Sequence, residues 1–254
     1  SLSTTGSSQS AISLKWKKLG NATSYKIYYI KSGESWSNAN SLNIATIYLN
    51  ESNGYLSKKL TGLSAGTTYS FRVRGIAENS YGSSSGTTSA TAVTTTNPAN
   101  VTTLKQTSSS TNSVTFSWKK VTGATNYIIY YRTSTKGSWK KVATCSSKTT
   151  SYKTKKFGST TVNAGKAYYI SVRAVRNYNY KNYYSSHITN FSVVTKPSDI
   201  KNLYTSKVKS TSLRLNWSQV SSASGYRIYY KSSKNGSWKV YKTISNSKLK
   251  KSKG

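Results

Sequence analysis

Few residues of this chain have the chemistry for acid–base or nucleophilic catalysis. The sequence holds one histidine, one cysteine and four acids, which are His187, Cys145, Glu34, Glu51, Glu78 and Asp199. Catalysis by paired carboxylates needs two positioned acids, and the best candidates, Glu34 and Glu51, both lie in turn-like stretches. We expect them to be solvated loop acids, because ionised carboxylates are rarely buried without a partner.

The remaining reactive groups also favour structural roles. A Ser–His–acid triad would have to use His187, yet no serine lies in a Gly-x-Ser-x-Gly turn, so we expect a half-exposed strand residue. Cys145 follows apolar residues in an expected strand and is interpreted as a small buried thiol. One cysteine and one histidine cannot supply the roughly four ligands of a zinc site, and no Gly-rich phosphate loop occurs. We therefore predict no catalytic residues, no metal site, no cofactor and no enzyme activity in this segment.

The charge of the chain indicates which partners it attracts. Lys and Arg total 38 against 4 Asp and Glu, a formal net charge of +34. Such a field attracts anions, but most of the cations are lysine, which favours diffuse attraction over specific nucleic-acid readout. We expect an anionic polysaccharide or wall polymer as partner, with the alternative that the charge protects edge strands from aggregation. No apolar run reaches the ~20 residues of a membrane helix, so no membrane insertion is expected.

A threefold internal repeat organises the sequence. Each copy has a tryptophan ending an alternating run (Trp16, Trp118, Trp217). Nine residues later each copy begins a Tyr-x-Ile-Tyr-Tyr run, at Tyr25, Tyr127 and Tyr226, and a second tryptophan follows at Trp36, Trp139 and Trp238. The chain therefore contains three copies of a unit of roughly 100 residues, a common domain size.

The pattern inside each copy predicts β-strands. Ile12, Leu14 and Trp16 alternate with polar residues, which is the period-two pattern of a half-buried strand. In the next run Tyr25 and Ile27 are expected to face the core. About seven short strands with frequent turns indicate a sandwich of two sheets.

These residues resemble those of the fibronectin type III domain. The resemblance rests on the tryptophans and Tyr-x-Ile-x-Tyr runs above and on tyrosine corners at residues 63–69 and 162–168, where Ala65 and Ala164 replace the usual proline. It implies an all-β chain of tandem immunoglobulin-like β-sandwiches, with a corner tyrosine hydroxyl bonded to upstream backbone. The predicted units are residues 1–96, residues 97–196 and a partial third unit, residues 197–254.

The ends and the linkers allow further expectations. The third copy lacks a second half, so we expect a piece of a longer array, with the alternative that a neighbouring subunit of the same array supplies the missing strands. The two linkers are short and contain Pro98 and Pro197, which restrict the backbone, so neighbouring units should stack end to end with little bending. The densest basic run of the chain lies at the end of the third copy, at Lys248, Lys250, Lys251 and Lys253.

Two surfaces are candidates for binding. The first is a loop of the second unit that is rich in Tyr and Asn, and its candidate residues are Arg176, Tyr178, Tyr180, Tyr183 and Tyr184. The second is the outer face of the sheet, where cation–π pairs are expected among Tyr28, Arg72, Tyr130 and Arg173. For both surfaces the alternative is a purely structural role.

The family resemblance suggests a role outside the cell. It implies a non-catalytic stalk or adhesion segment of a larger secreted or cell-surface protein. Scarce proline, abundant Lys and Tyr and the absence of a disulfide resemble the bacterial surface-protein type. The alternatives are a binding module for anionic glycans or cell-wall polymers and an accessory module of a carbohydrate-degrading enzyme.

Overall fold

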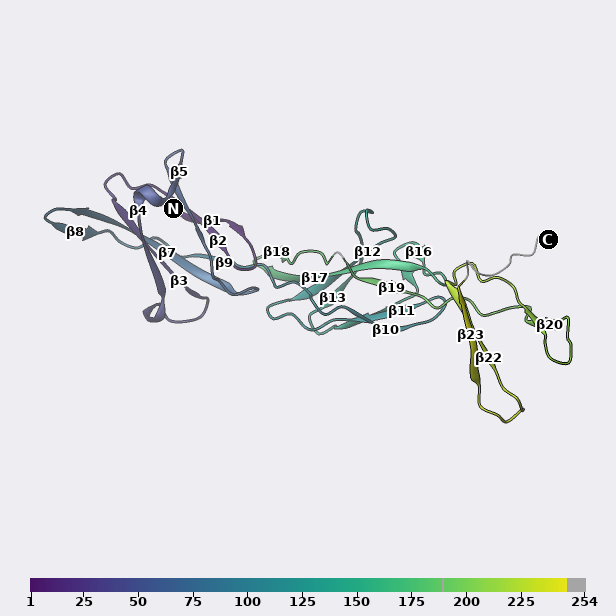
Figure 1. Cartoon of the computed structure of the whole chain (residues 1–254). Helices are drawn as coiled ribbons and strands as arrows, with labels where there is room; N and C mark the ends of the chain where they lie inside the picture. Colours follow the sequence, from purple (N-terminus) through teal and green to yellow (C-terminus); the bar gives the residue numbers. More distant parts are fainter. Residues whose placement is uncertain (189, 246–254) are drawn as a thin grey trace.

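The computed structural model describes residues 1–188 and 190–245, and the basic run at residues 248–253 lies outside the described residues. Strands dominate throughout, and the two short 3₁₀ helices both lie in the first unit. The strands fall into three sets that follow one another along the chain (Figure 1). We call these sets the first unit (β1–β9), the second unit (β10–β19) and the third unit (β20–β23).

The first unit has two antiparallel sheets. One has the strand order β1-β2-β6-β5 and the other β4-β3-β7-β8, with β9 also paired to β7. The elements are β1 (Leu2–Ser7), β2 (Ile12–Lys17), β3 (Ser24–Lys31), η1 (Trp36–Asn38), β4 (Asn40–Ala45), η2 (Thr46–Tyr48), β5 (Asn50–Ser52), β6 (Tyr55–Leu60), β7 (Thr68–Asn79), β8 (Gly82–Ser85) and β9 (Ala92–Thr95).

The second unit repeats this plan. A sheet β10-β11-β14 faces a sheet β13-β12-β17-β18, to which β19 is added through β17, and β15 and β16 form a small hairpin. The strands are β10 (Lys105–Ser109), β11 (Val114–Ser117), β12 (Asn126–Arg132), β13 (Lys140–Ser146), β14 (Ser151–Thr154), β15 (Lys156–Phe157), β16 (Thr160–Thr161), β17 (Ala167–Tyr178), β18 (Lys181–Tyr184) and β19 (Ser192–Val194).

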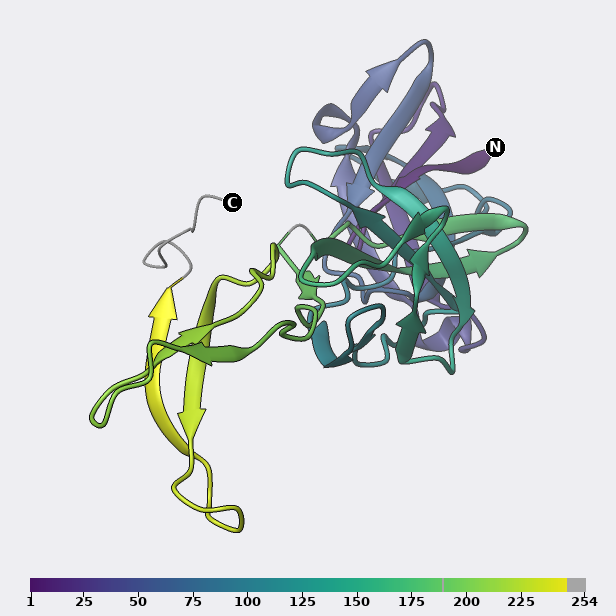
Figure 2. The same ribbon diagram turned by 90° about the vertical axis from the view of Figure 1, so that its right-hand side faces the viewer.

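The third unit has the first four strands of the same plan. Its two sheets are two-stranded pairs, β20-β21 and β22-β23. The strands are β20 (Tyr204–Ser206), β21 (Arg214–Asn216), β22 (Gly225–Tyr230) and β23 (Lys239–Ser245). Figure 2 shows these two pairs standing clear of the second unit.

Each complete unit encloses its own apolar core between its sheets. In the first unit Ile12, Leu14 and Trp16 point inward on β2 and are fully or almost fully buried, as the period-two pattern predicts. The second core gathers equivalent residues, among them Val114, Phe116 and Trp118. The prediction of an all-β chain with tandem sandwiches is confirmed.

The tyrosine corner fixes how the two sheets of each complete unit are joined. The backbone N–H of Ser64 donates to the Tyr69 hydroxyl at 2.9 Å, and that of Asn163 donates to the Tyr168 hydroxyl at the same distance. The predicted bond to upstream backbone is therefore present in both units. Alanine in place of proline leaves this geometry intact, because the bond uses only main chain and tyrosine.

Candidate functional site

The predicted binding loop is a tight hairpin formed by β17 and β18. Asn179 and Tyr180 occupy its tip with φ of 47° and 60°, the left-handed values of a two-residue type I′ turn. Tyr180 is completely exposed, and Tyr178 precedes the turn on β17 and is half-buried. The hairpin therefore presents one tyrosine to solvent at its tip.

Two of the candidate residues instead lie between the first and second units. Arg176 and Tyr183 are cross-strand partners, so their side chains share one face of the hairpin. Arg176 donates through Nη1 to the Gly123 carbonyl and through Nη2 to Thr68 Oγ1 of the first unit, both at 3.2 Å. The Tyr183 hydroxyl lies 3.0 Å from Thr94 Oγ1 in a buried contact. The structure thus divides the five predicted residues. Alternation sends Tyr183 and Tyr184 to opposite faces of the hairpin, the turn leaves Tyr180 exposed at the tip, and contacts with the first unit take up Arg176 and Tyr183.

Backbone contacts complete this joint. Gly66 and Gly123 touch with left-handed φ values of 61° and 76°, and a Cβ on Gly66 would lie 2.9 Å from the Thr122 carbonyl oxygen. The linker residue Asn97 donates its N–H to the Ser8 carbonyl and accepts from the Gly66 N–H, both at 2.9 Å. The linker is therefore fastened to the first unit on two sides, and the second unit rests against the tyrosine corner.

The joint between the second and third units uses an equivalent contact. Gly165, which follows the corner of the second unit as Gly66 follows that of the first, packs against Ser222 of the third unit. Its N–H donates to the Lys196 carbonyl, and the Lys196 N–H donates to the Ser110 carbonyl. Lys196 therefore repeats the two backbone hydrogen bonds of Asn97. Ser222 takes the place that Gly123 has in the first joint.

The outer sheet face of the first unit carries the predicted cations and aromatics. Tyr28 and Arg72 lie opposite each other on β3 and β7. The Arg72 guanidinium carbon, however, lies 4.1 Å from the ring centroid of Trp36, while Arg74 lies 5.8 Å from that of Tyr28. The second tryptophan of the repeat thus takes the position over Arg72 that was expected for a tyrosine.

The second unit extends this arrangement into a row of half-buried side chains. Arg132 lies 4.3 Å from the Trp139 ring centroid, and Trp139 stacks on His187 with centroids 5.3 Å apart. The Tyr130 ring meets His187 edge-on at 4.7 Å. Arg173 lies 4.8 Å from the ring of Tyr184, so its partner is not Tyr130 as expected. We call this row, Arg132, Trp139, His187, Tyr130, Arg173 and Tyr184, the aromatic–basic row.

Sequence reasoning did not assign Trp36 and Trp139 a role. The available signal was their recurrence, together with Trp238, after the Tyr-x-Ile-Tyr-Tyr run of every copy. In the third unit Lys231 takes the place of the arginine, with its Nζ 5.2 Å from the Trp238 centroid. The second tryptophan of each copy therefore covers a cation.

His187 lies between β18 and β19 rather than within a strand. Desolvation, followed by the charges of Arg173 and Arg132, lowers its pKa from 6.5 to about 4. Its Nδ1 lies 3.1 Å from Ser171 Oγ. A neutral imidazole with no acid among its described contacts is not arranged as a triad.

Glu51 and Cys145, which were also considered for chemistry, have structural surroundings. Glu51 forms an ion pair with Lys18 at 2.8 Å. Cys145 is half-buried at the edge of the second core, less than the full burial expected, and desolvation raises the pKa of its thiol. Within residues 1–188 and 190–245, no three potential metal ligands are grouped. No helix in that part of the chain has the length and apolarity to cross a bilayer.

Comparison with known proteins gives one family match and several structural likenesses. No curated protein matches the sequence. A two-domain fibronectin type-III segment of chicken tenascin is 20% identical, covers 77% of this chain and 97% of its own, and has a TM-score of 0.44. The FN1–FN3 domains of chicken CNTN1 are 16% identical, cover 97% of this chain and 84% of their own, and have a TM-score of 0.37. The family model described as Fibronectin type III domain matches residues 1–91, and the second unit repeats the strand plan of that matched first unit.

Proposed function

We propose that this chain is a non-catalytic spacer and adhesion segment of a larger secreted or cell-surface protein, in which it holds neighbouring parts at a fixed separation. The observation that carries the proposal is the joint between the first two units. A flexible tether would leave the units without mutual contacts. Here side chains and backbone of both units meet across the linker, through Arg176, Tyr183 and the Gly66–Gly123 contact.

The proposal is tested by measuring how rigid the joint is in solution. Spin labels on Ser83→Cys and Lys136→Cys, in a Cys145→Ser background, report the distance between the units by electron–electron resonance. A stiff spacer gives one narrow distance distribution. A broad distribution in the parent chain would overturn the proposal.

Matched glycine variants then show whether the observed contacts cause the rigidity. Gly66→Ala places a Cβ against the second unit, so the distribution should shift or broaden. Gly158→Ala imposes nearly the same backbone strain, since φ is 62° against 61°, but meets open space. The control variant should keep the parent distribution, and equal broadening in both would show that the glycine contact does not set the geometry.

A second candidate function, binding of anionic glycans or wall polymers, is favoured by a different observation. The net charge is +34, and Tyr180 stands fully exposed at the tip of a two-residue hairpin turn beside Lys181. An exposed aromatic ring gives contact area on a sugar face, and the surrounding lysines give salt-sensitive attraction. Retention on an anionic polysaccharide column that weakens with salt, and weakens further in a Tyr178→Ala, Tyr180→Ala double variant, would support this function. Retention unchanged by the double variant would show that charge alone accounts for the binding.

A further inference from the structure

The cations of the second unit are concentrated in one stretch of its sequence. Residues 97–196 contain sixteen Lys and Arg and no Asp or Glu, and six of the sixteen fall within residues 140–156. All six side chains are exposed. We call this set the lysine strip, and its members are Lys140, Lys141, Lys148, Lys153, Lys155 and Lys156.

The lysine strip follows two edge strands that border the same side of the sandwich. β13 lies at the edge of one sheet and β14 at the edge of the other. The turn between them, residues 147–150, holds Lys148 and is too short to cross both a sheet and the gap of about 10 Å between sheets. β13 has seven residues, so the strip extends for about 20 Å along the strands.

The two edges also offer backbone groups to a ligand. In the part of the chain that the structure describes, β13 pairs only with β12 and β14 only with β11. The outward N–H and C=O groups of an edge strand can donate to and accept from another molecule. A ligand that carries hydroxyl groups as well as negative charges can therefore use both the backbone and the lysines.

The lysines of the strip are not engaged elsewhere in the protein. Within residues 1–188 and 190–245 none of them has an ion pair or lies over an aromatic ring. The arginines of the second unit differ in this respect, since Arg132 and Arg173 lie over rings and Arg176 bridges to the first unit. The strip is therefore the available part of the charge of this unit.

Protection of the edges against aggregation does not account for so many lysines. The equivalent edge strand of the first unit is β4, and its six residues contain no cation. Residues 40–60, from the start of β4 to the end of β6, have two lysines and the acid Glu51, and β5 covers the edge of β6. The same fold thus has an edge without lysines, so the strip is a particular property of the second unit.

We propose that the lysine strip is a binding site for an acidic polysaccharide, whose acid groups meet the lysines while its hydroxyls bond to the edge backbone. Lysine supplies compact point charges rather than the bidentate geometry suited to reading bases. No large apolar or aromatic side chain of residues 140–156 is exposed, so the strip has no platform on which nucleic-acid bases could stack. The inference rests on the second candidate function and assigns the charged part of that binding to one side of the second unit.

Two triple variants of the full chain test this site, and they differ only in where lysines are removed. The strip variant combines Lys148→Gln, Lys153→Gln and Lys155→Gln, and the control variant in the first unit combines Lys17→Gln, Lys31→Gln and Lys59→Gln. Both variants lower the net charge by the same amount. All six positions are exposed, so both variants should keep the fold, which circular dichroism checks.

The measurement is calorimetric titration with polygalacturonate at about 150 mM salt, where exposed charges farther apart than about 8 Å are screened from each other. The strip variant should bind about tenfold more weakly than the parent chain, since it loses three exposed charge contacts. The control variant should stay within about twofold of the parent, because its lysines lie outside the site.

The contrary outcomes separate the site from the function. Equal weakening in both variants would overturn the inference but not the second candidate function, because net charge would then decide the affinity. No binding by the parent chain would overturn both. Tighter binding of duplex DNA than of polygalacturonate, with the same loss in the strip variant, would overturn the choice of a polysaccharide as ligand.

Discussion

The second and third units share one framework but bury it to very different extents. Tyr131 is 4% exposed in the second unit, whereas its counterpart Tyr230 is 50% exposed in the third. The aromatic contact of Trp118 with Tyr127 and that of Trp217 with Tyr226 are nevertheless almost identical. Among the described residues, the local framework therefore has the same geometry with and without covering strands, and the covering strands add burial.

The comparison separates two contributions to the stability of a sandwich. Hydrogen bonds from the turn to the framework tyrosine are present in both units. Removal of apolar side chains from water is nearly complete in the second unit and partial in the third. Because apolar burial is the main favourable term in folding, the two units should respond differently to the same substitution.

The largest difference is expected at the central isoleucine. Ile129→Ala removes a completely buried side chain and should destabilise the second unit by about 2–5 kcal/mol. Ile228→Ala should cost the third unit less than half as much, since Ile228 remains partly exposed. Hydrogen exchange in increasing urea, followed separately for β12 and β22, measures both. Equal losses would show that the third core is closed in solution.

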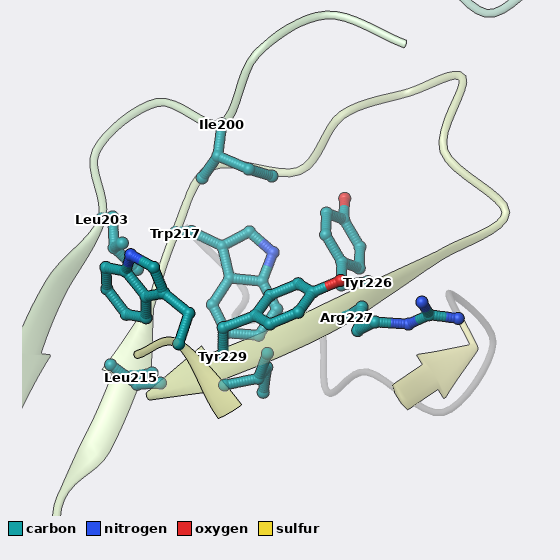
Figure 3. A pocket seen from close by; sticks show the side chains of 9 residues that line it. Ile200, Leu203, Leu215, Trp217, Tyr226, Arg227 and Tyr229 are labelled. Atoms are coloured by element: carbon teal, nitrogen blue, oxygen red, sulfur yellow. The ribbon is translucent and has the colours of Figure 1, made fainter. Parts of the chain in front are cut away.

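A smaller difference is expected at the framework tyrosine. Tyr127→Phe leaves the buried N–H of Val121 without its acceptor, at a cost of about 1–3 kcal/mol. Tyr226 lines an open apolar groove between the strand pairs of the third unit (Figure 3), so in the Tyr226→Phe variant we expect water from the groove to replace the hydroxyl at a lower cost. Tyr180→Phe, at a fully exposed position, serves as the control and should change nothing. Matching losses at Tyr127 and Tyr226 would contradict the role given to water.

The smallest effect is a pH dependence confined to the second unit. The pKa of His187 is lowered from 6.5 to about 4 in the folded chain, so the unfolded chain takes up the proton first. The stability of the second unit should therefore be full above pH 6.5 and decline as the pH falls from 6.5 towards 4. The effect is modest because the ring is partly exposed.

Urea unfolding at neutral pH and at about pH 4.5 measures this decline. His187→Phe keeps an aromatic ring beside Trp139 and should flatten the dependence. The third unit, which has no histidine, should change little between these pH values. A variant as pH-sensitive as the parent would show that His187 is not the source of the dependence, since residues 97–196 contain no Asp or Glu.

The sequence allowed the frameworks to be predicted, but the contacts between units were not predictable. Ile12, Leu14 and Trp16 alternate within one strand, so their burial follows from local period. Arg176 contacts Thr68, which lies 108 residues away in the sequence, and the local periodicity of hydrophobic residues does not predict such a pair. The predicted binding loop therefore grouped Arg176 and Tyr183 with Tyr180, because their contacts with Thr68 and Thr94 of the first unit leave no signal in the local sequence.

The fastening of Asn97 has a mechanical consequence. Its N–H and its carbonyl are both hydrogen-bonded to the first unit, at Ser8 and Gly66. The linker therefore cannot lengthen at Asn97 unless these bonds break. A pulling force applied to the two ends of this pair would load these hydrogen bonds and the Arg176 bridge before the connecting peptide could straighten. The tandem should therefore transmit tension at almost constant extension and lengthen abruptly only when the joint breaks.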